Sequence, residues 1–87
     1  MRNAEPFADF ETIAASPNPI YPGGWINFQN LPKGAYQVRL LDTNGREVSS
    51  ERMTKGWIQI GLLPAGMYFY VLERERVRIG VGKLSIQ

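Results

Sequence analysis

Residues 24–40 read GWINFQNLPKGAYQVRL and residues 56–72 read GWIQIGLLPAGMYFYVL, and these two stretches decide the fold. Aligned at an offset of 32 residues, they are identical at eight of 17 positions. Two copies are too few for a solenoid, in which several stacked units share a continuous core. The repeat therefore predicts one strand–turn–strand unit that is used twice within a single sandwich. The identities pair Gly24, Trp25, Ile26, Leu31, Pro32, Gly34, Tyr36 and Leu40 with Gly56, Trp57, Ile58, Leu63, Pro64, Gly66, Tyr68 and Leu72.

Each copy has the pattern of two strands joined by a turn. Ile26 and Phe28 alternate with Asn27, which is the period of a half-buried strand. In the Leu-Pro-x-Gly motif that follows, Pro fixes φ and Gly permits a positive φ, so the motif predicts a turn. The last strand of the second copy is apolar on both faces. Its second face carries Met67, Phe69 and Val71, which are either covered or form a surface for self-association or for contact with the parent protein.

The remaining segments also predict short strands. Asn44-Gly45 is a strong hairpin signal, and the polar stretch 47–53 that follows it predicts an edge strand. Residues 73–76 predict a solvated turn, and a change of phase across Gly82 predicts a bulge or bend there. No helical periodicity is present. About seven short strands at close spacing indicate an all-β fold, an antiparallel β-sandwich.

Length and composition limit the functions that the chain can have. Its 87 residues are 44% hydrophobic with a formal net charge of +2, which fits one small domain. The absence of histidine and cysteine removes imidazole acid–base catalysis, thiol nucleophiles, Cys or His zinc sites and disulfides. Arginines 74, 76 and 78 alternate with Glu73 and Glu75, unlike the clustered cations of a nucleic-acid site. We expect no enzyme activity, cofactor, metal, nucleic-acid partner or transmembrane segment.

Four motifs, taken in order, resemble the C-terminal sorting domain of the type IX secretion system of Bacteroidetes. The resemblance runs from about residue 13 to residue 87, with residues 1–12 predicted to be a linker to an upstream cargo and 13–87 the sorting domain. Met1 without a signal peptide suits an excised part of a longer cargo protein. The motifs are Ser16-Pro17-Asn18-Pro19; Gly34-x-Tyr36-x-Val38-x-Leu40-x-Asp42-x-x-Gly45-Arg46-x-Val48; Ile58-x-Ile60-x-x-Leu63-x-x-Gly66-x-Tyr68-x-Tyr70-x-Leu72; and Gly82-Lys83-Leu84-x-Ile86.

The resemblance implies an immunoglobulin-like sandwich and a role in secretion. Such domains carry cargo through the periplasm, are recognised by the outer-membrane translocon, and are then usually removed by a sortase that attaches the cargo to anionic lipopolysaccharide at the cell surface. The cut is expected in the linker before Ser16. The residues that the resemblance implies in recognition by translocon and sortase proteins are Pro17, Asn18, Pro19, Gly45, Arg46, Gly66, Tyr68, Lys83, Leu84, Ser85, Ile86 and Gln87.

Each of these features also has a purely structural interpretation. Pro17-Asn18-Pro19 and Asn44-Gly45-Arg46 are turn-forming sequences in any protein, and Tyr68 has the position of a core aromatic residue. The segment from Lys83 to Gln87 alternates like a final strand, whose open edge and carboxylate would suit recognition by strand addition or terminus capture.

Trp25 and Trp57 lie on the outer-face parity of their strands and either cover sheet edges or stack on sugars. The alternative function is therefore an accessory carbohydrate-binding or adhesion module. A third possibility is that the domain stays uncleaved as a part of the secretion machinery itself.

Overall fold

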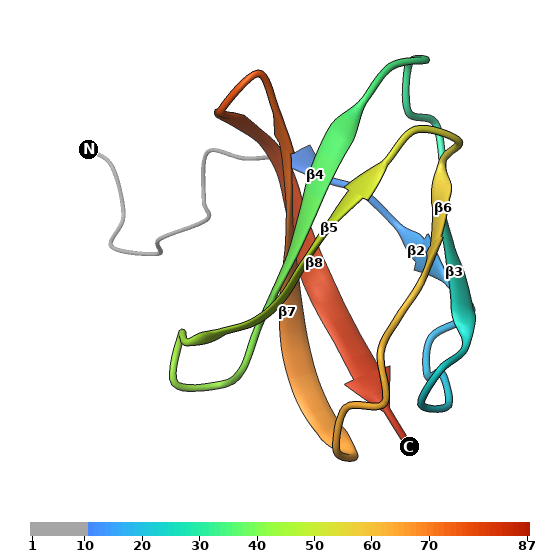
Figure 1. The fold of residues 1–87 in the computed structure, drawn as a ribbon, viewed down its shortest axis with the longest axis vertical. Coiled ribbons are helices and arrows are strands. Elements are labelled where there is room, and N and C mark those ends of the chain that lie inside the picture. The colour runs from blue at the N-terminus through green and yellow to red at the C-terminus, as the bar shows by residue number, and fades with distance from the viewer. Residues whose placement is uncertain (1–10) are drawn as a thin grey trace.

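The structure, a computed structural model, describes residues 11–87 as two β-sheets packed face to face (Figure 1). One sheet has the strand order β1-β8-β7-β4-β5 and the other has the order β2-β3-β6. The predicted all-β sandwich is confirmed, and two of its strands contain only two residues each. The strands are β1 (Glu11–Thr12), β2 (Ala15–Ser16), β3 (Trp25–Phe28), β4 (Tyr36–Leu41), β5 (Glu47–Met53), β6 (Trp57–Gln59), β7 (Gly66–Arg74) and β8 (Val77–Ile86).

The two copies of the repeat pair with each other in both sheets. In the three-stranded sheet β3 is antiparallel to β6, and Ile26 lies directly opposite Ile58. In the five-stranded sheet β4 is antiparallel to β7, and Arg39 lies directly opposite Val71. The partners in each pair are 32 residues apart, which is the offset of the repeat. A pseudo-twofold axis therefore runs through both sheets at these two pairs.

The core lies between the sheets and is built from the alternating apolar residues of the strands. Phe28 and Tyr70 meet there with ring centroids 5.1 Å apart in an edge-to-face arrangement. Full burial of an aliphatic side chain stabilises the fold by about 1.5–3 kcal/mol. The core residues are Ile20, Ile26, Phe28, Tyr36, Val38, Leu40, Met53, Ile58, Ile60, Tyr68, Tyr70, Leu72, Leu84 and Ile86.

β5 is an edge strand, as predicted from its polar sequence. Glu51 lies opposite Val38, so it is on the inner face of the sheet, yet its side chain is exposed. A charged residue that points inward at a sheet edge disfavours pairing with another chain. The sequence of β5 thus protects the edge that it forms.

The predicted bulge at Gly82 is wrong. Gly82 pairs regularly with Tyr70, and the register shift lies instead between Leu72 and Glu73, opposite Ile79. A Cβ atom on Gly82 would lie 2.2 Å from the Tyr70 ring, so this glycine makes room for that ring. The Tyr70 hydroxyl reaches past β8 and donates a hydrogen bond to the carbonyl oxygen of Ile13.

The β7–β8 turn is shorter than the predicted turn at 73–76. Glu73 and Arg74 belong to β7, and the chain reverses at Glu75 and Arg76, which have φ angles of 52° and 66°. Two consecutive residues with positive φ are typical of a two-residue hairpin loop whose twist matches that of the strands.

The segment that enters the domain is attached to the last strand. Glu11 and Thr12, which fall in the predicted linker, pair in parallel with Gly80 and Val81 of β8. The rest of the predicted linker lies outside the described residues. The first described residues therefore form one edge of the five-stranded sheet.

Candidate functional site: the surface where Asn18 meets the last strand

Asn18 links the Pro17-Asn18-Pro19 motif to the last strand. Its Nδ2 donates to the carbonyl oxygen of Lys83 at 2.8 Å, and its Oδ1 accepts from the backbone N–H of Ser85 at 3.0 Å. The side-chain amide thus makes the two hydrogen bonds to β8 that a peptide group of a neighbouring strand would otherwise make. The peptide bonds that precede Pro17 and Pro19 are both cis.

Ile20 continues the same edge. Its N–H donates to the carbonyl oxygen of Ser85 at 2.9 Å, and its carbonyl oxygen accepts from the N–H of Gln87 at 2.8 Å. Further up the strand, the N–H of Ile13 donates to the carbonyl oxygen of Val81. Residues 11–20, which we call the strap, therefore cover the edge of β8 that faces away from β7. The predicted open edge for strand addition is not present in the folded domain, because the strap already occupies it.

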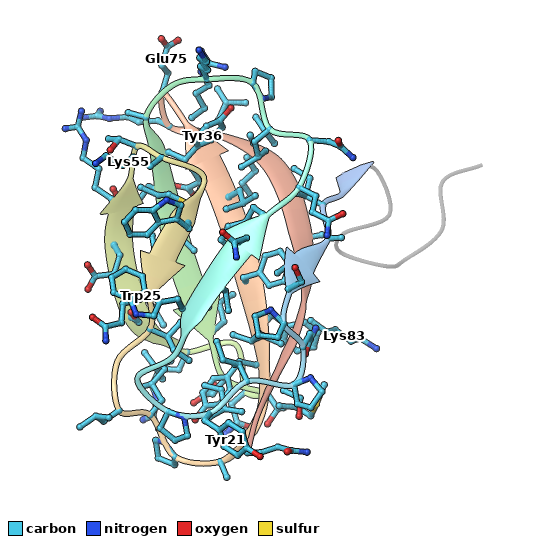
Figure 2. All side chains as sticks on the ribbon, turned by 90° about the vertical axis from the view of Figure 1, so that its right-hand side faces the viewer. Tyr21, Trp25, Tyr36, Lys55, Glu75 and Lys83 are labelled. Atoms are coloured by element: carbon cyan, nitrogen blue, oxygen red, sulfur yellow. The ribbon has the colours of Figure 1, made fainter. Side chains whose placement is uncertain are left out.

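The alternation predicted for the last strand is confirmed. Leu84 and Ile86 are 0% and 2% exposed and belong to the core. Lys83 and Gln87 are exposed, and Ser85 is half-buried. The side chains that a partner could contact are therefore those on the outer face, with Lys83 the most prominent at this side of the molecule in Figure 2.

Gly66 and Tyr68 lie next to this strand and shape the turn before β7. Gly66 has a φ of 151° and pairs with Ile86, while Tyr68 pairs with Leu84 and is buried. The Tyr68 hydroxyl donates to the carbonyl oxygen of Pro64 at 2.6 Å. In the first copy of the repeat, Tyr36 bonds to the carbonyl oxygen of Pro32 in the same way. The shared Leu-Pro-x-Gly-x-Tyr sequence is thus explained by a turn that its own tyrosine closes.

The Gly45-Arg46 turn lies apart from the other predicted site residues. It joins β4 to β5, and β7 separates β4 from β8. Asp42 Oδ1 accepts from the N–H groups of Asn44 and Arg46, and Gly45 has a φ of 83°. The N–H of Arg46 is the main reason that the pKa of the Asp42 carboxyl is lowered. The Arg46 side chain is largely exposed and forms an ion pair with Asp42.

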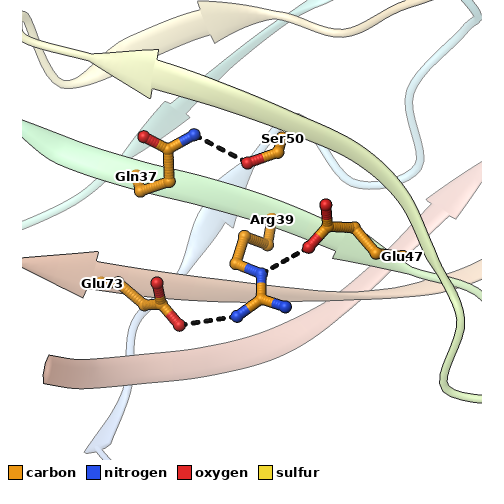
Figure 3. Close-up of polar contacts among 5 residues, drawn as sticks. All are labelled: Gln37, Arg39, Glu47, Ser50 and Glu73. Atoms are coloured by element: carbon orange, nitrogen blue, oxygen red, sulfur yellow. Dashed lines mark hydrogen bonds and ion pairs between the residues drawn. The ribbon is translucent and has the colours of Figure 1, made fainter. Parts of the chain in front are cut away.

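The outer face of the five-stranded sheet carries a small charged network (Figure 3). Arg39 of β4 donates from Nε to Glu47 at 2.6 Å and from Nη1 to Glu73 at 2.8 Å, and these bonds raise the pKa of its guanidinium. Beside it, Gln37 donates to the hydroxyl of Ser50. These contacts tie three neighbouring strands together across their exposed side.

The second face of β7, predicted as a possible surface for self-association, is partly covered. Val71, in the middle of β7, is 1% exposed. Phe69 is half-buried. Met67, at 47%, is the exposed member of the three. The structure covers Val71 and leaves Met67 open, and self-association through this face stays a prediction.

Trp25 and Trp57 lie on the outer face of the three-stranded sheet, as predicted. Their rings meet at a centroid distance of 4.9 Å and an angle of 70°, and both remain exposed. The two indoles therefore pack against each other, and part of each ring stays exposed to solvent. In Figure 2, Trp25 and Lys55 lie toward one side of the molecule and Lys83 toward the other.

The four sequence motifs do not by themselves predict which of them meet in the folded domain. The first, third and fourth motifs converge at Asn18, Gly66 and Ser85, whereas the Gly45-Arg46 turn stands apart. Tyr70 and Gly82 both belong to these motifs, but their pairing across β7 and β8 was not predicted. Within residues 11–87, no helix is long and apolar enough to cross a membrane, and no three acidic residues gather as metal ligands.

Comparisons with known proteins bear on the family and the fold of this chain. The sequence model of the family described as "secretion system C-terminal sorting domain" matches residues 16–87. A solved structure of PorZ, described as an essential bacterial surface component of the type IX secretion system of Porphyromonas gingivalis, has the same fold, with a TM-score of 0.64 at 16% identity. The match covers 86% of this chain and 11% of the PorZ chain. A comparison with curated protein sequences gives no match.

Proposed function

The chain belongs to the family of type IX secretion-system C-terminal sorting domains, and from this premise we propose that translocon and sortase proteins read it as a signal. Its task is to direct an upstream cargo domain of the same protein from the periplasm across the outer membrane to the cell surface or the medium. It acts by binding and not by catalysis. The sortase cut falls on the amino-terminal side of Glu11, because residues from Glu11 onward are held in the sheet.

One observation carries this proposal: the strap and the last strand form a single surface. Asn18 bonds to both Lys83 and Ser85, so two motifs that are 65 residues apart in the chain become neighbours in space. A receptor can therefore read both motifs at once, and only on a folded domain. The exposed residues available to it are Pro17, Asn18, Pro19, Lys83 and Gln87.

The buried residues of the predicted site contribute to recognition by stabilising the fold that positions the exposed ones. Tyr68, Leu84 and Ile86 have their side chains in the core, so a receptor cannot contact them without opening the sandwich. They position Lys83 and Ser85 on the opposite face of the strand. We therefore assign the contact role to the exposed residues and a positioning role to these three.

A reporter export assay tests the proposal. A fluorescent protein with a Sec signal peptide is fused ahead of residues 1–87 and produced in a host that has a type IX system. We compare the unchanged fusion with Lys83→Glu, which reverses one exposed charge on the proposed surface. Lys33→Glu is the matched control, because Lys33 is an exposed lysine in the β3–β4 turn. Both variants are checked for unchanged thermal unfolding as isolated domains.

We expect the unchanged fusion and Lys33→Glu to reach the surface or the medium, and Lys83→Glu to accumulate in the periplasm at several-fold higher levels. Retention of a folded, unchanged fusion in the periplasm contradicts the sorting function of this chain. Normal export of Lys83→Glu instead keeps the function and contradicts the assigned surface.

A further inference from the structure

The outer face of the three-stranded sheet carries two tryptophans and two carboxamides in an alternating arrangement. Trp25 lies opposite Gln59 on the neighbouring strand, and Asn27 lies opposite Trp57. Because directly opposite residues in an antiparallel pair point to the same face, the four side chains share one surface. We call this set of four residues the Trp–amide face. Its tryptophans follow from the repeat, since they occupy equivalent positions in the two copies.

The indole rings are accessible although they touch each other. Trp25 is 52% exposed and Trp57 is 41% exposed, and their rings cross at 70°. Aromatic side chains usually bury a large area, and the contact between the two indoles leaves much of that area exposed. An exposed aromatic pair of this size is a feature that a ligand with apolar C–H faces can cover.

The carboxamides beside the rings have free hydrogen-bonding capacity. Gln59 uses Nε2 to donate to the carbonyl oxygen of Gly23 at 2.9 Å, which fixes its side chain and leaves Oε1 as an acceptor. The Asn27 carboxamide has no hydrogen-bond partner among residues 11–87, so it offers both a donor and an acceptor. Together they match the mixed donors and acceptors of hydroxyl groups.

An open hollow of about 550 Å³ lies beside the rings, between β5 and β6. This volume is within the range of small-molecule sites. Its lining includes one acidic and two basic residues, Glu51, Arg52 and Lys55. The ammonium of Lys55 lies 5.9 Å from the centre of the Trp57 ring. Charges of both signs in this lining favour a polar but uncharged ligand over an anion.

We propose that the Trp–amide face and this hollow bind a neutral polysaccharide. A pyranose ring stacks its C–H face on an indole, its hydroxyls bond to Asn27 and Gln59, and the next sugar enters the hollow. Trp25 and Lys55 lie toward the side of the molecule away from Lys83 (Figure 2), whereas Asn27 pairs with Ser16 of the strap. Sugar binding of this kind needs no contact with Lys83 and is therefore a function distinct from sorting. Such binding would keep the protein that carries this domain attached to a surface made of polysaccharide.

Native affinity electrophoresis of the purified chain, residues 1–87, tests this inference without any secretion machinery. The gels contain one of four neutral polymers (hydroxyethyl cellulose, mixed-linkage β-glucan, galactomannan or laminarin) or one of two anionic polymers (polygalacturonate or alginate). The variants are Trp25→Ala, Trp57→Ala and Asn27→Ala. Tyr21→Ala is the matched control, since it removes an exposed aromatic residue at a loop outside the face. Thermal unfolding of each variant is measured alongside.

We expect at least one neutral polymer to retard the unchanged protein and the Tyr21→Ala variant equally. Each tryptophan variant should lower the association constant at least tenfold, and Asn27→Ala several-fold. The Asn27 variant keeps the test valid if a tryptophan variant fails to fold, because the Asn27 side chain is exposed and makes no hydrogen bond among residues 11–87. Three results overturn the inference: no retardation by any neutral polymer, retardation by the anionic polymers only, or retardation that survives Trp25→Ala and Asn27→Ala in folded protein.

Discussion

At the scale of single residues, Gly82 packs closely against the Tyr70 ring, which leaves no room for a Cβ atom. The Tyr70 ring lies over Gly82, crosses the last strand and reaches the carbonyl oxygen of Ile13 on the other side. A tyrosine can do this only where the intervening residue has no side chain. One glycine therefore allows one hydroxyl to fasten the strap to the core.

Replacing Gly82 should test this contact directly. Gly82→Ala places a Cβ atom 2.2 Å from the Tyr70 ring, so the ring must move, and we expect a loss of about 1–3 kcal/mol in the free energy of unfolding. Gly61→Ala is the control, because a Cβ there meets nothing within 4 Å and should cost less than about 0.5 kcal/mol. Denaturant unfolding of both variants gives the two values, and equal values would rule out the packing role of Gly82.

Tyr70 should also make stability depend on pH in the alkaline range. Burial raises the pKa of its hydroxyl above the usual value of 10.0, so the folded state keeps a proton that the unfolded chain loses. The resulting stabilisation is complete below pH 10 and is lost as the pH rises through the folded-state pKa. The free energy of unfolding should therefore fall above pH 10, and fall less steeply in Tyr70→Phe. Tyr21→Phe, at an exposed site, should keep the slope of the unchanged protein.

At the scale of elements, the sequence predicted most strands and turns but not the strap. Ile26 and Phe28 predict β3, because the alternation of apolar and polar residues is a local pattern. Asn44-Gly45 predicts the β4–β5 turn, because the conformation of a turn depends on its own residues. Asn18 gives no such signal, since its partners Lys83 and Ser85 are 65 and 67 residues away. The misplaced bulge has the same origin: the role of Gly82 depends on Tyr70 in another strand.

Asn18→Ala should loosen the strap without disturbing the core. The change removes two hydrogen bonds at an exposed site, for which we expect a loss of about 1–2 kcal/mol. The amide of Ser85 loses its acceptor, so its hydrogen exchange should accelerate more than that of core amides. Asn27→Ala, at another exposed asparagine, should leave the exchange rate of Ser85 unchanged. Protection of Ser85 that survives Asn18→Ala would show that the strap is held by its other contacts.

At the scale of the whole molecule, the repeat produces a pseudo-symmetric sandwich to which a strap and a last strand are added. Ile26 with Ile58 and Arg39 with Val71 mark the axis, and β8 has no counterpart within the repeat. The part of the chain that carries the proposed recognition surface is thus the part that breaks the symmetry. The sequence could predict the repeat, but not where its copies meet, because identical halves can pack in several ways.

Removing residues 83–87 should unfold the domain and not merely remove a signal. The truncation deletes Leu84 and Ile86 from the core, at about 2–5 kcal/mol each. An 87-residue domain has about 4–13 kcal/mol of stability in total. We expect the truncated chain to lack a cooperative transition in circular dichroism, whereas Lys83→Glu retains one. A cooperative transition in the truncated chain would mean that β8 adds little to the core.

The parallel pairing of the strap with β8 also determines how the domain bears mechanical load. A pull applied to the cargo side at Glu11 and to the far end at Gln87 acts along two strands that run in the same direction. Such a force loads the hydrogen bonds at Ile13, Asn18 and Ile20 together in shear, and does not unzip them one after another. The proposed export would pull along this line, and the domain therefore has its most resistant geometry in the direction in which that force acts.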